Sequence, residues 1–337
     1  MKLHLRTESW PLRAPARITG HTFTRVDVVV VRLQEGELLG RGEAAGVYYR
    51  GESASRMAEQ IEAVRRPIEA GIDRMQLQCL LPPGGARNAV DCALWELEAA
   101  LTGRPVWQLA GLQAPRPLLT TWTIGAGDPE EMAESARAYT TARALKLKLI
   151  GDQTDAARIQ AVRAARPDVW LGVDANQGFS RDSFTKLLLV LTDAHVELIE
   201  QPFPIGSEAL LDDLESPIAI AADESAQDSR DLPSLMERFD VINIKLDKCG
   251  GLTEGLAMAA QARQRGFKVM VGNMFGTSLA MAPAFLLGQC SEIVDLDGPL
   301  ALASDRSPCI SYSDGQIHCP QNIWGSGDAR PSGAGVN

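Results

Sequence analysis

The stretch Ala-Leu-Lys-Leu-Lys-Leu-Ile at residues 144–150 alternates apolar and basic side chains, which is typical of a β-strand with two different faces. Further short apolar runs follow it, and each of them ends in a charged residue. From Lys148 onward the steps are 26, 26, 23 and 22 residues, and they lead to Asp174, Glu200, Asp223 and Lys245. A step of this size fits one strand, one loop and one helix that returns to the next strand. Because charges inside a buried sheet are costly, we expect these side chains to gather at one functional mouth.

Eight apolar runs of strand length lie in the second part of the chain, at residues 118–124, 144–149, 170–174, 196–200, 218–223, 241–245, 268–272 and 293–296. Helical patterns separate them, for example at residues 155–166, 181–191, 254–265 and 277–287. This alternation predicts a closed (β/α)8 barrel with its active site at the carboxyl ends of the strands. A doubly wound open sheet is the alternative, but no Gly-x-Gly-x-x-Gly follows a first strand.

The first part of the chain is predicted to be a mixed α+β unit. Valine-rich runs at residues 24–33 and near 38–43 favour two strands, and residues 53–65 and 86–101 have helical spacing of apolar side chains. The fold class that we expect is therefore α/β. It has three parts, an α+β capping domain at 1–113 joined by part of the C-terminal tail, a catalytic barrel at 114–310 and the tail at 311–337.

Composition excludes several classes of protein. The formal net charge of -10 argues against a nucleic acid or an anionic membrane as partner. No run approaches the roughly 20 apolar residues that span a bilayer, and the first residues have no apolar core of signal-peptide length. The six cysteines form no Cys-x-x-Cys pair, which favours reduced thiols in the cytoplasm. We expect a cytoplasmic homo-oligomer that acts on a small molecule.

Lys146 and Lys148 lie two residues apart on one strand, so both side chains point to the barrel interior. Two neighbouring ammonium groups lower each other's pKa, and a general base at neutral pH works best with a pKa of roughly 7–8. The alternative is a pair of exposed lysines at a strand edge. Lys245 ends the sixth strand, across the barrel from the second, so it would face Lys148. Two bases on opposite sides of one carbon are what inversion of a stereocentre requires.

Asp174, Glu200 and Asp223 would repel one another without a cation between them. Their oxygen ligands favour Mg²⁺, with Mn²⁺ as an alternative, and the four histidines are too scattered for a zinc site. Each aspartate could instead cap a helix. Asp295 and Asp297 form a second carboxylate pair, which could bind an organic ammonium group or simply mark the exit of the strand.

These residues resemble the enolase superfamily, and within its muconate-lactonizing subgroup they are most similar to dipeptide epimerases of the L-Ala-D/L-Glu type. A lysine base beside Mg²⁺ is established chemistry for that superfamily. The matching motifs in the barrel are Lys-Leu-Lys-Leu at 146–149, Asp-Ala-Asn at 174–176, Glu-Gln-Pro at 200–202, Asp-Glu-Ser at 223–225, Ile-Lys-Leu-Asp-Lys-Cys-Gly-Gly at 244–251 and Asp-Leu-Asp-Gly-Pro at 295–299. Motifs at 10–12, 42–44, 49–53 and 86–95 match in the first domain.

The resemblance implies a Mg²⁺-dependent isomerase in peptidoglycan peptide metabolism. Lys148 and Lys245 would be the acid/base pair, supported by Lys146. The metal ligands would be Asp174, Glu200 and Asp223, and the dipeptide's ammonium group would lie between Asp295 and Asp297. Relatives that act as N-acylamino acid racemases, o-succinylbenzoate synthases or muconate cycloisomerases bind no free ammonium group. These activities, and a catalytically silent binding module, are the alternatives.

By the same resemblance, two loops near residues 17–25 and 45–53 would shape the pocket for the substrate side chain. Epimerases of Ala-Glu carry an arginine in the first loop, where this chain has Phe23, with Arg25 and Arg17 nearby. Phe23 in the pocket would favour a hydrophobic dipeptide, whereas an arginine there would keep Ala-Glu possible. Phe23 and Arg25 are therefore candidate substrate-binding residues.

Overall fold

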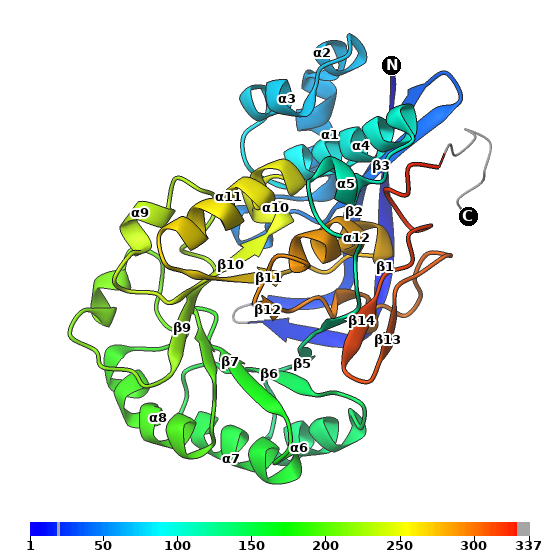
Figure 1. The fold of residues 1–337 in the computed structure, drawn as a ribbon. Coiled ribbons are helices and arrows are strands. Elements are labelled where there is room, and N and C mark those ends of the chain that lie inside the picture. The colour runs from blue at the N-terminus through cyan, green and yellow to red at the C-terminus, as the bar shows by residue number, and fades with distance from the viewer. Residues whose placement is uncertain (19–20, 329–337) are drawn as a thin grey trace.

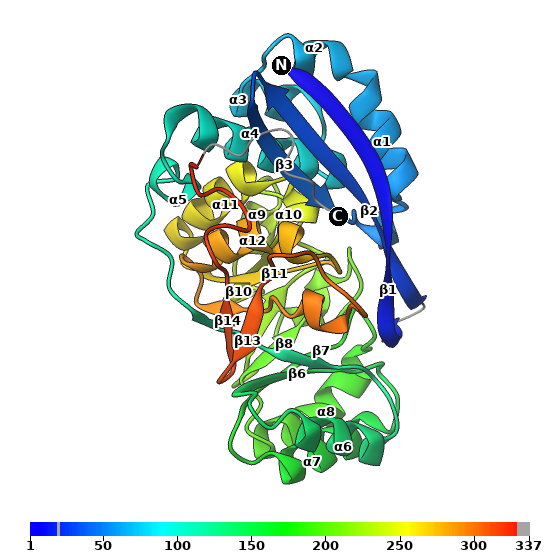
Figure 2. The same ribbon diagram turned by 90° about the vertical axis from the view of Figure 1, so that its right-hand side faces the viewer.

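The computed structural model describes residues 1–18 and 21–328, without the side chains of residues 17 and 18. An N-terminal antiparallel sheet has the strand order β1-β2-β3, and it runs alongside the parallel sheet of the barrel (Figures 1 and 2). Its strands are β1 (Lys2–Ile18), β2 (His21–Glu35) and β3 (Leu38–Ala44). The short helix η1 (Tyr48–Arg50) and the helices α1 (Ala54–Ala63), α2 (Arg65–Glu69), α3 (Arg74–Leu80), α4 (Gly85–Thr102) and α5 (Val106–Leu109) follow.

The valine run of β2 is buried on both faces of its strand. Val28 and Val30 belong to the core shared with the barrel, whereas Val29 and Val31 pack in the core beneath the N-terminal helices. Strand β3 lies so close to α4 that a Cβ on Gly40 would be 2.1 Å from the backbone oxygen of Ala93. The sheet is thus fixed between its own helices and the barrel, which explains why the run shows no polar alternation.

The barrel contains eight parallel strands in the order β12-β11-β10-β9-β8-β7-β6-β5, which confirms the predicted fold class. They are β5 (Trp122–Ile124), β6 (Ala144–Lys148), β7 (Trp170–Asp174), β8 (Leu198–Glu200), β9 (Ala219–Ala222), β10 (Val241–Lys245), β11 (Lys268–Gly272) and β12 (Ile293–Val294). At the seam, the backbone N–H of Thr121 donates to the carbonyl of Val294 at 3.0 Å, so the first and last strands meet.

Helices surround this sheet, and the predicted helical stretches are confirmed within one or two residues at most of their ends. They are α6 (Pro129–Ala138), α7 (Asp155–Ala165), α8 (Arg181–Asp193), α9 (Leu232–Leu235), α10 (Leu246–Cys249), α11 (Leu252–Gln264) and α12 (Ser278–Gly288), with the short helices η2 (Glu208–Leu211) and η3 (Gly298–Ala301). Among the residues described, no helix is both long and apolar enough to cross a membrane.

The single strand predicted at residues 118–124 is wrong, because two strands occupy that range. Strand β4 (Leu118–Leu119) pairs with β14 (Gln316–His318), which in turn pairs with β13 (Ser311–Ser313), and only β5 joins the barrel. Between them Thr120 and Thr121 are buried, and the Thr120 hydroxyl accepts the N–H of Leu296 at 3.0 Å. Because residues 120 and 121 bond to β12 and the segment that follows it, the chain leaves one sheet after β4 and enters the barrel at β5.

Arg306 fastens the N-terminal sheet to the barrel. Its guanidinium donates to Glu43 of β3 and to Glu8 of β1, at 2.6 Å each, and to the Thr277 hydroxyl before α12 at 2.7 Å. The Arg306 and Glu43 side chains are 7% and 0% exposed, so neither charge can be solvated by water if its partner is lost.

We predict that Arg306→Ala lowers the free energy of unfolding by about 3–5 kcal/mol, because the mutation leaves the Glu43 carboxylate buried and unpaired. Urea unfolding followed by circular dichroism measures the change. Lys186→Ala, which removes a pair on α8 that is 73% and 74% exposed, is the matched control and should cost less than about 1 kcal/mol. Equal losses in the two variants would contradict the role of Arg306.

Candidate active site

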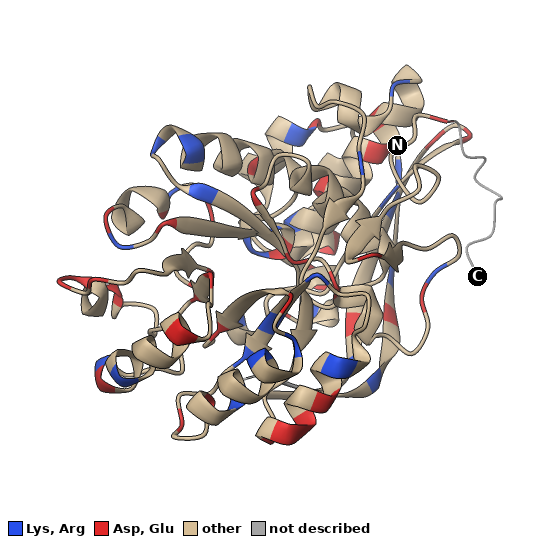
Figure 3. Cartoon of the chain, turned by 60° about the horizontal axis from the view of Figure 1, so that its bottom comes forward, with Lys and Arg blue, Asp and Glu red and all other residues tan. Residues whose placement is uncertain are grey.

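A cavity of about 1140 Å³ lies at the carboxyl ends of the barrel strands, under the N-terminal sheet. Its walls come from both parts of the chain. The N-terminal part contributes Phe23, Arg25, Tyr48 and Tyr49, and the barrel contributes Lys146, Lys148, Asp223, Glu224, Lys245, Asp295 and Asp297. In Figure 3 acidic and basic segments lie next to one another around the centre of the barrel. Charged groups from distant parts of the sequence therefore share one cavity.

Lys148 and Lys245 end strands β6 and β10, the second and sixth strands of the barrel, which lie across from each other. The Lys148 Nζ is 2.5 Å from Asp174 Oδ2 and 3.0 Å from Asn176 Oδ1. On the other side, the Lys245 Nζ is 2.6 Å from Asp223 Oδ2. Both lysines line the cavity, and the carboxylates of the intervening strands separate them.

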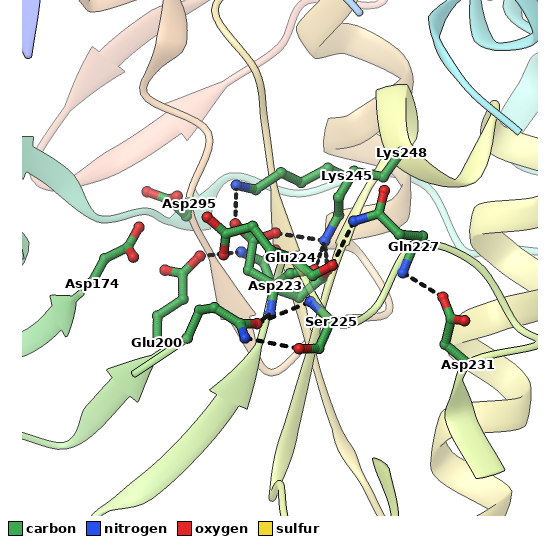
Figure 4. Close-up of polar contacts among 12 residues, drawn as sticks. Asp174, Glu200, Asp223, Glu224, Ser225, Gln227, Asp231, Lys245, Lys248 and Asp295 are labelled. Atoms are coloured by element: carbon green, nitrogen blue, oxygen red, sulfur yellow. Dashed lines mark hydrogen bonds and ion pairs between the residues drawn. The ribbon is translucent and has the colours of Figure 1, made fainter. Parts of the chain in front are cut away.

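Asp174 and Glu200 are the last residues of β7 and β8, and the strand register places them side by side. Asp223 directly follows β9, so the three carboxylates follow one another around the mouth (Figure 4). All three are at most 1% exposed. Burial and, next, the charge of Asp174 raise the pKa of Glu200 to about 7.

The donor chemistry of this trio fits a hard divalent cation, since three buried carboxylates come from adjacent strands. In the described residues, however, no three His, Cys, Asp or Glu side chains converge closely enough to hold an ion. Lysines pair with these carboxylates. Lys146 Nζ is 3.1 Å from Glu200 Oε2, and Lys245 and Lys248 both contact Asp223, at 2.6 and 2.5 Å.

The expectation that crowding lowers the pKa is wrong for Lys146, and the pKa of Lys245 is raised as well. Burial does lower both values, but the neighbouring carboxylates outweigh it. Asp295 and Glu200 hold the pKa of Lys146 well above its usual range, and Asp223 and Glu200 do the same for Lys245.

Asp295 and Asp297 differ in their surroundings. Asp295 forms a buried ion pair with the Nζ of Lys146 and accepts the hydroxyl of Thr121. Asp297 accepts the backbone N–H of Thr123 at 2.6 Å, and burial together with the charge of Asp295 raises its pKa to about 6. Asp297 is therefore the carboxylate of the pair that lacks a basic partner at ion-pair distance among the described residues.

The sequence reasoning missed Lys248 and Glu224. Lys248 is fully buried and donates to Asp223 Oδ1 at 2.5 Å, because the single turn of α10 brings it back beneath Lys245. The sequence signal was its spacing of three residues from Lys245, since residues three apart on a helical turn lie on the same face. Glu224 is 2% exposed, and its Oε2 lacks a hydrogen-bond partner in the described structure.

Phe23 lines the cavity and is half-buried. Its ring lies 5.1 Å from that of Tyr48 and 5.9 Å from that of Phe275. Arg25 also borders the cavity, but its side chain is 66% exposed and lies 3.3 Å from Asp27. The side chain of Arg17 lies outside the described part of the chain.

Both parts of the chain match known protein families. Residues 1–111 match the mandelate racemase / muconate lactonizing enzyme N-terminal domain, and residues 130–323 match the enolase C-terminal domain-like family. The chain is 39% identical to the L-Ala-D/L-Glu epimerase of Escherichia coli (strain K12), over 92% of this chain and 97% of that protein. It is 38% identical to the N-acetyl-D-glutamate racemase of a Pseudoalteromonas species, over 88% and 95%.

Solved structures agree with these matches. A protein from Agrobacterium tumefaciens with homology to dipeptide epimerases, bound to sodium and L-Ala-L-Glu, superposes with a TM-score of 0.93 at 42% identity, over 96% of this chain and 99% of that one. The dipeptide epimerase of Methylococcus capsulatus, complexed with Mg and L-Arg-D-Lys, gives a TM-score of 0.87 at 30% identity, over 98% and 97%.

Proposed function

Since the chain belongs to the enolase superfamily, in its mandelate racemase and muconate lactonizing enzyme branch, we propose that it is a cytosolic, Mg²⁺-dependent dipeptide epimerase. The reaction inverts the α-carbon of the second residue. The observation that carries the proposal is the placement of Lys148 and Lys245 on opposite strands of one cavity, with three buried carboxylates between them.

In this proposal one lysine removes the α-proton from one face of the substrate and the other lysine returns a proton to the opposite face. The reverse reaction exchanges their roles, so one lysine must begin neutral and the other protonated. Lys146 holds Asp295 and Glu200 in place behind Lys148. Asp174, Glu200 and Asp223 would hold the Mg²⁺, or Mn²⁺, which would stabilise the negative charge that develops on the substrate.

The parts of the chain would have different roles. We propose that residues 1–113 cap the site, that residues 114–310 supply the chemistry and that residues 311–337 form a tail. The six cysteines, which all lie in the described part, are free thiols, and this supports a reducing compartment. A homo-oligomeric state and a role in peptidoglycan peptide metabolism stay predictions.

The proposal is tested by incubating the enzyme and Mg²⁺ with a panel of L,L-dipeptides and separating the stereoisomers by chiral chromatography. We expect inversion at the second residue and none at the first. A panel without any inverted dipeptide would contradict the proposal.

Racemisation of N-acylamino acids is the second candidate, and two observations favour it. One relative at 38% identity is an N-acetyl-D-glutamate racemase, and Asp295 is already paired with Lys146. The same two lysines would act on such a substrate. Turnover of N-acetyl or N-succinyl amino acids, without turnover of free dipeptides, would favour this candidate.

We predict that Asp297→Asn raises KM for free dipeptides by about 10-fold or more, because a desolvated ion pair with the substrate ammonium is lost. The matched comparison uses N-acetylated dipeptides, whose KM should not change by more than about 2-fold, since they carry no ammonium group. Steady-state kinetics with both substrates measures the difference. If KM for the free dipeptide does not change, Asp297 does not bind the ammonium group.

A further inference from the structure

An aromatic cluster covers one side of the cavity. It includes His21 and Tyr49, whose rings lie 4.8 and 5.2 Å from that of Tyr48. Its three central rings are those of Phe23, from β2, Tyr48, from η1, and Phe275, from the loop after β11, so the cluster joins the N-terminal part to the barrel. Phe23 contacts the other two rings edge-on, with interplanar angles of 77° and 63°. All three side chains line the cavity and are half-buried, so they offer apolar surface to whatever enters.

The cluster shares the cavity with Lys245 and with the Asp295/Asp297 pair. Gln227 Nε2 donates to the hydroxyl of Tyr49, the next residue after Tyr48, at 3.1 Å and to the carbonyl of Glu224 at 2.7 Å. The segment of Tyr48 therefore lies against the loop that follows Asp223, the carboxylate that Lys245 contacts at 2.6 Å. Burial raises the pKa of Tyr48 above its usual range, so the hydroxyl stays neutral. The side chain of the second residue, whose α-carbon would react with Lys245, would therefore contact these rings.

The charges of the cavity wall disfavour an acidic side chain there. The described basic residues of the wall are Arg13, Arg25, Lys146, Lys148 and Lys245. Each of the three lysines contacts a buried carboxylate, Arg25 lies beside Asp27, and Arg13 is exposed. The rim also carries Glu8, Asp27, Glu52 and Glu131. A carboxylate buried against the rings would have only the solvent-exposed Arg13 and Arg25 as unburied counter-charges in the described wall, and burying a charge without a close partner is costly.

We propose, resting on the proposed function, that the preferred substrates carry an apolar side chain at the second residue, aromatic or large aliphatic, and that Phe23, Tyr48 and Phe275 form its pocket. A well-packed apolar pocket distinguishes side chains that differ by one or a few methylene groups by about 10- to 200-fold. We therefore expect kcat/KM for L-Ala-L-Phe or L-Ala-L-Leu to exceed that for L-Ala-L-Glu by about 10-fold or more.

The test compares kcat/KM for L-Ala-L-Phe and L-Ala-L-Glu in the wild type, in Phe23→Arg and in Phe23→Ala. Both substitutions should lower the Phe/Glu ratio, and Phe23→Arg should lower it more because it adds a cation. Leu189→Arg is the matched control, since Leu189 is an apolar residue of α8 that is 68% exposed and does not line the cavity. This control should leave the ratio within about 2-fold of the wild type.

Three results would overturn the inference. A wild type that prefers L-Ala-L-Glu, with a preference that Arg25→Ala removes, would assign the side chain to Arg25 and leave the epimerase proposal intact. A Phe/Glu ratio that Phe23→Arg and Phe23→Ala leave unchanged would place the side chain elsewhere in the cavity. Turnover of N-acylamino acids alone would instead reject the proposed function and the inference together.

Discussion

Replacing either Lys148 or Lys245 by alanine should lower the rate of epimerisation by about 10²- to 10⁴-fold, the range that general acid–base groups contribute. Each lysine serves one face of the α-carbon, so the loss of one interrupts inversion in both directions. The two single variants should therefore be similarly impaired, and the double variant should be little worse than either. Chiral chromatography of the dipeptide after fixed incubation times measures the loss.

Lys186→Ala is the control for this experiment, because Lys186 is an exposed residue of α8 that does not line the cavity. Circular dichroism should show the same fold in all variants. If Lys148→Ala or Lys245→Ala kept more than about a tenth of the wild-type rate, that lysine would not transfer the proton.

Glu200→Gln should weaken the binding of Mn²⁺, which electron paramagnetic resonance measures. Mutation of a residue that only hydrogen-bonds to a metal ligand typically lowers metal affinity by about 10- to 100-fold, and we expect a larger loss for Glu200 because it would bind the metal directly. Glu200 is the middle carboxylate of the trio and is fully buried, so an amide removes charge without changing shape. The same variant should lose epimerase activity, and chelation of the wild type should abolish activity until Mg²⁺ returns.

Glu215→Gln, at an exposed position, is the matched control and should bind Mn²⁺ like the wild type. An unchanged affinity in Glu200→Gln would remove Glu200 from the metal site. Because metal binding is measured without substrate, this result is independent of which dipeptide the enzyme accepts.

Much of the fold could be predicted from the sequence because the spacing of charged strand ends carries topological information. Lys148, Asp174 and Glu200 are each the last residue of a strand, as the regular steps predicted. Strand β1 was not predicted, because Lys2–Ile18 carries charged and polar residues and two prolines between its apolar ones. Its stability comes from pairing with β2, a tertiary contact that local propensity does not report.

The environment of each site residue was harder to predict than its position. The strand pattern placed Lys146 and Lys148 on one face, but it could not show which carboxylates would surround them. Since Lys146 contacts both Glu200 and Asp295, its pKa moves upward and not downward. Counter-charges come from residues that are distant in the sequence, and only the closed barrel brings them together.

The most direct test of the two-base mechanism is deuterium exchange in heavy water with the two lysine variants and Mg²⁺, followed by mass spectrometry. Each variant keeps one base, so Lys148→Ala should exchange the α-proton of only one stereoisomer at the second residue, and Lys245→Ala that of the other. If both variants exchanged the same stereoisomer, or both stereoisomers equally, the two lysines would not act on opposite faces and the proposed mechanism would be contradicted.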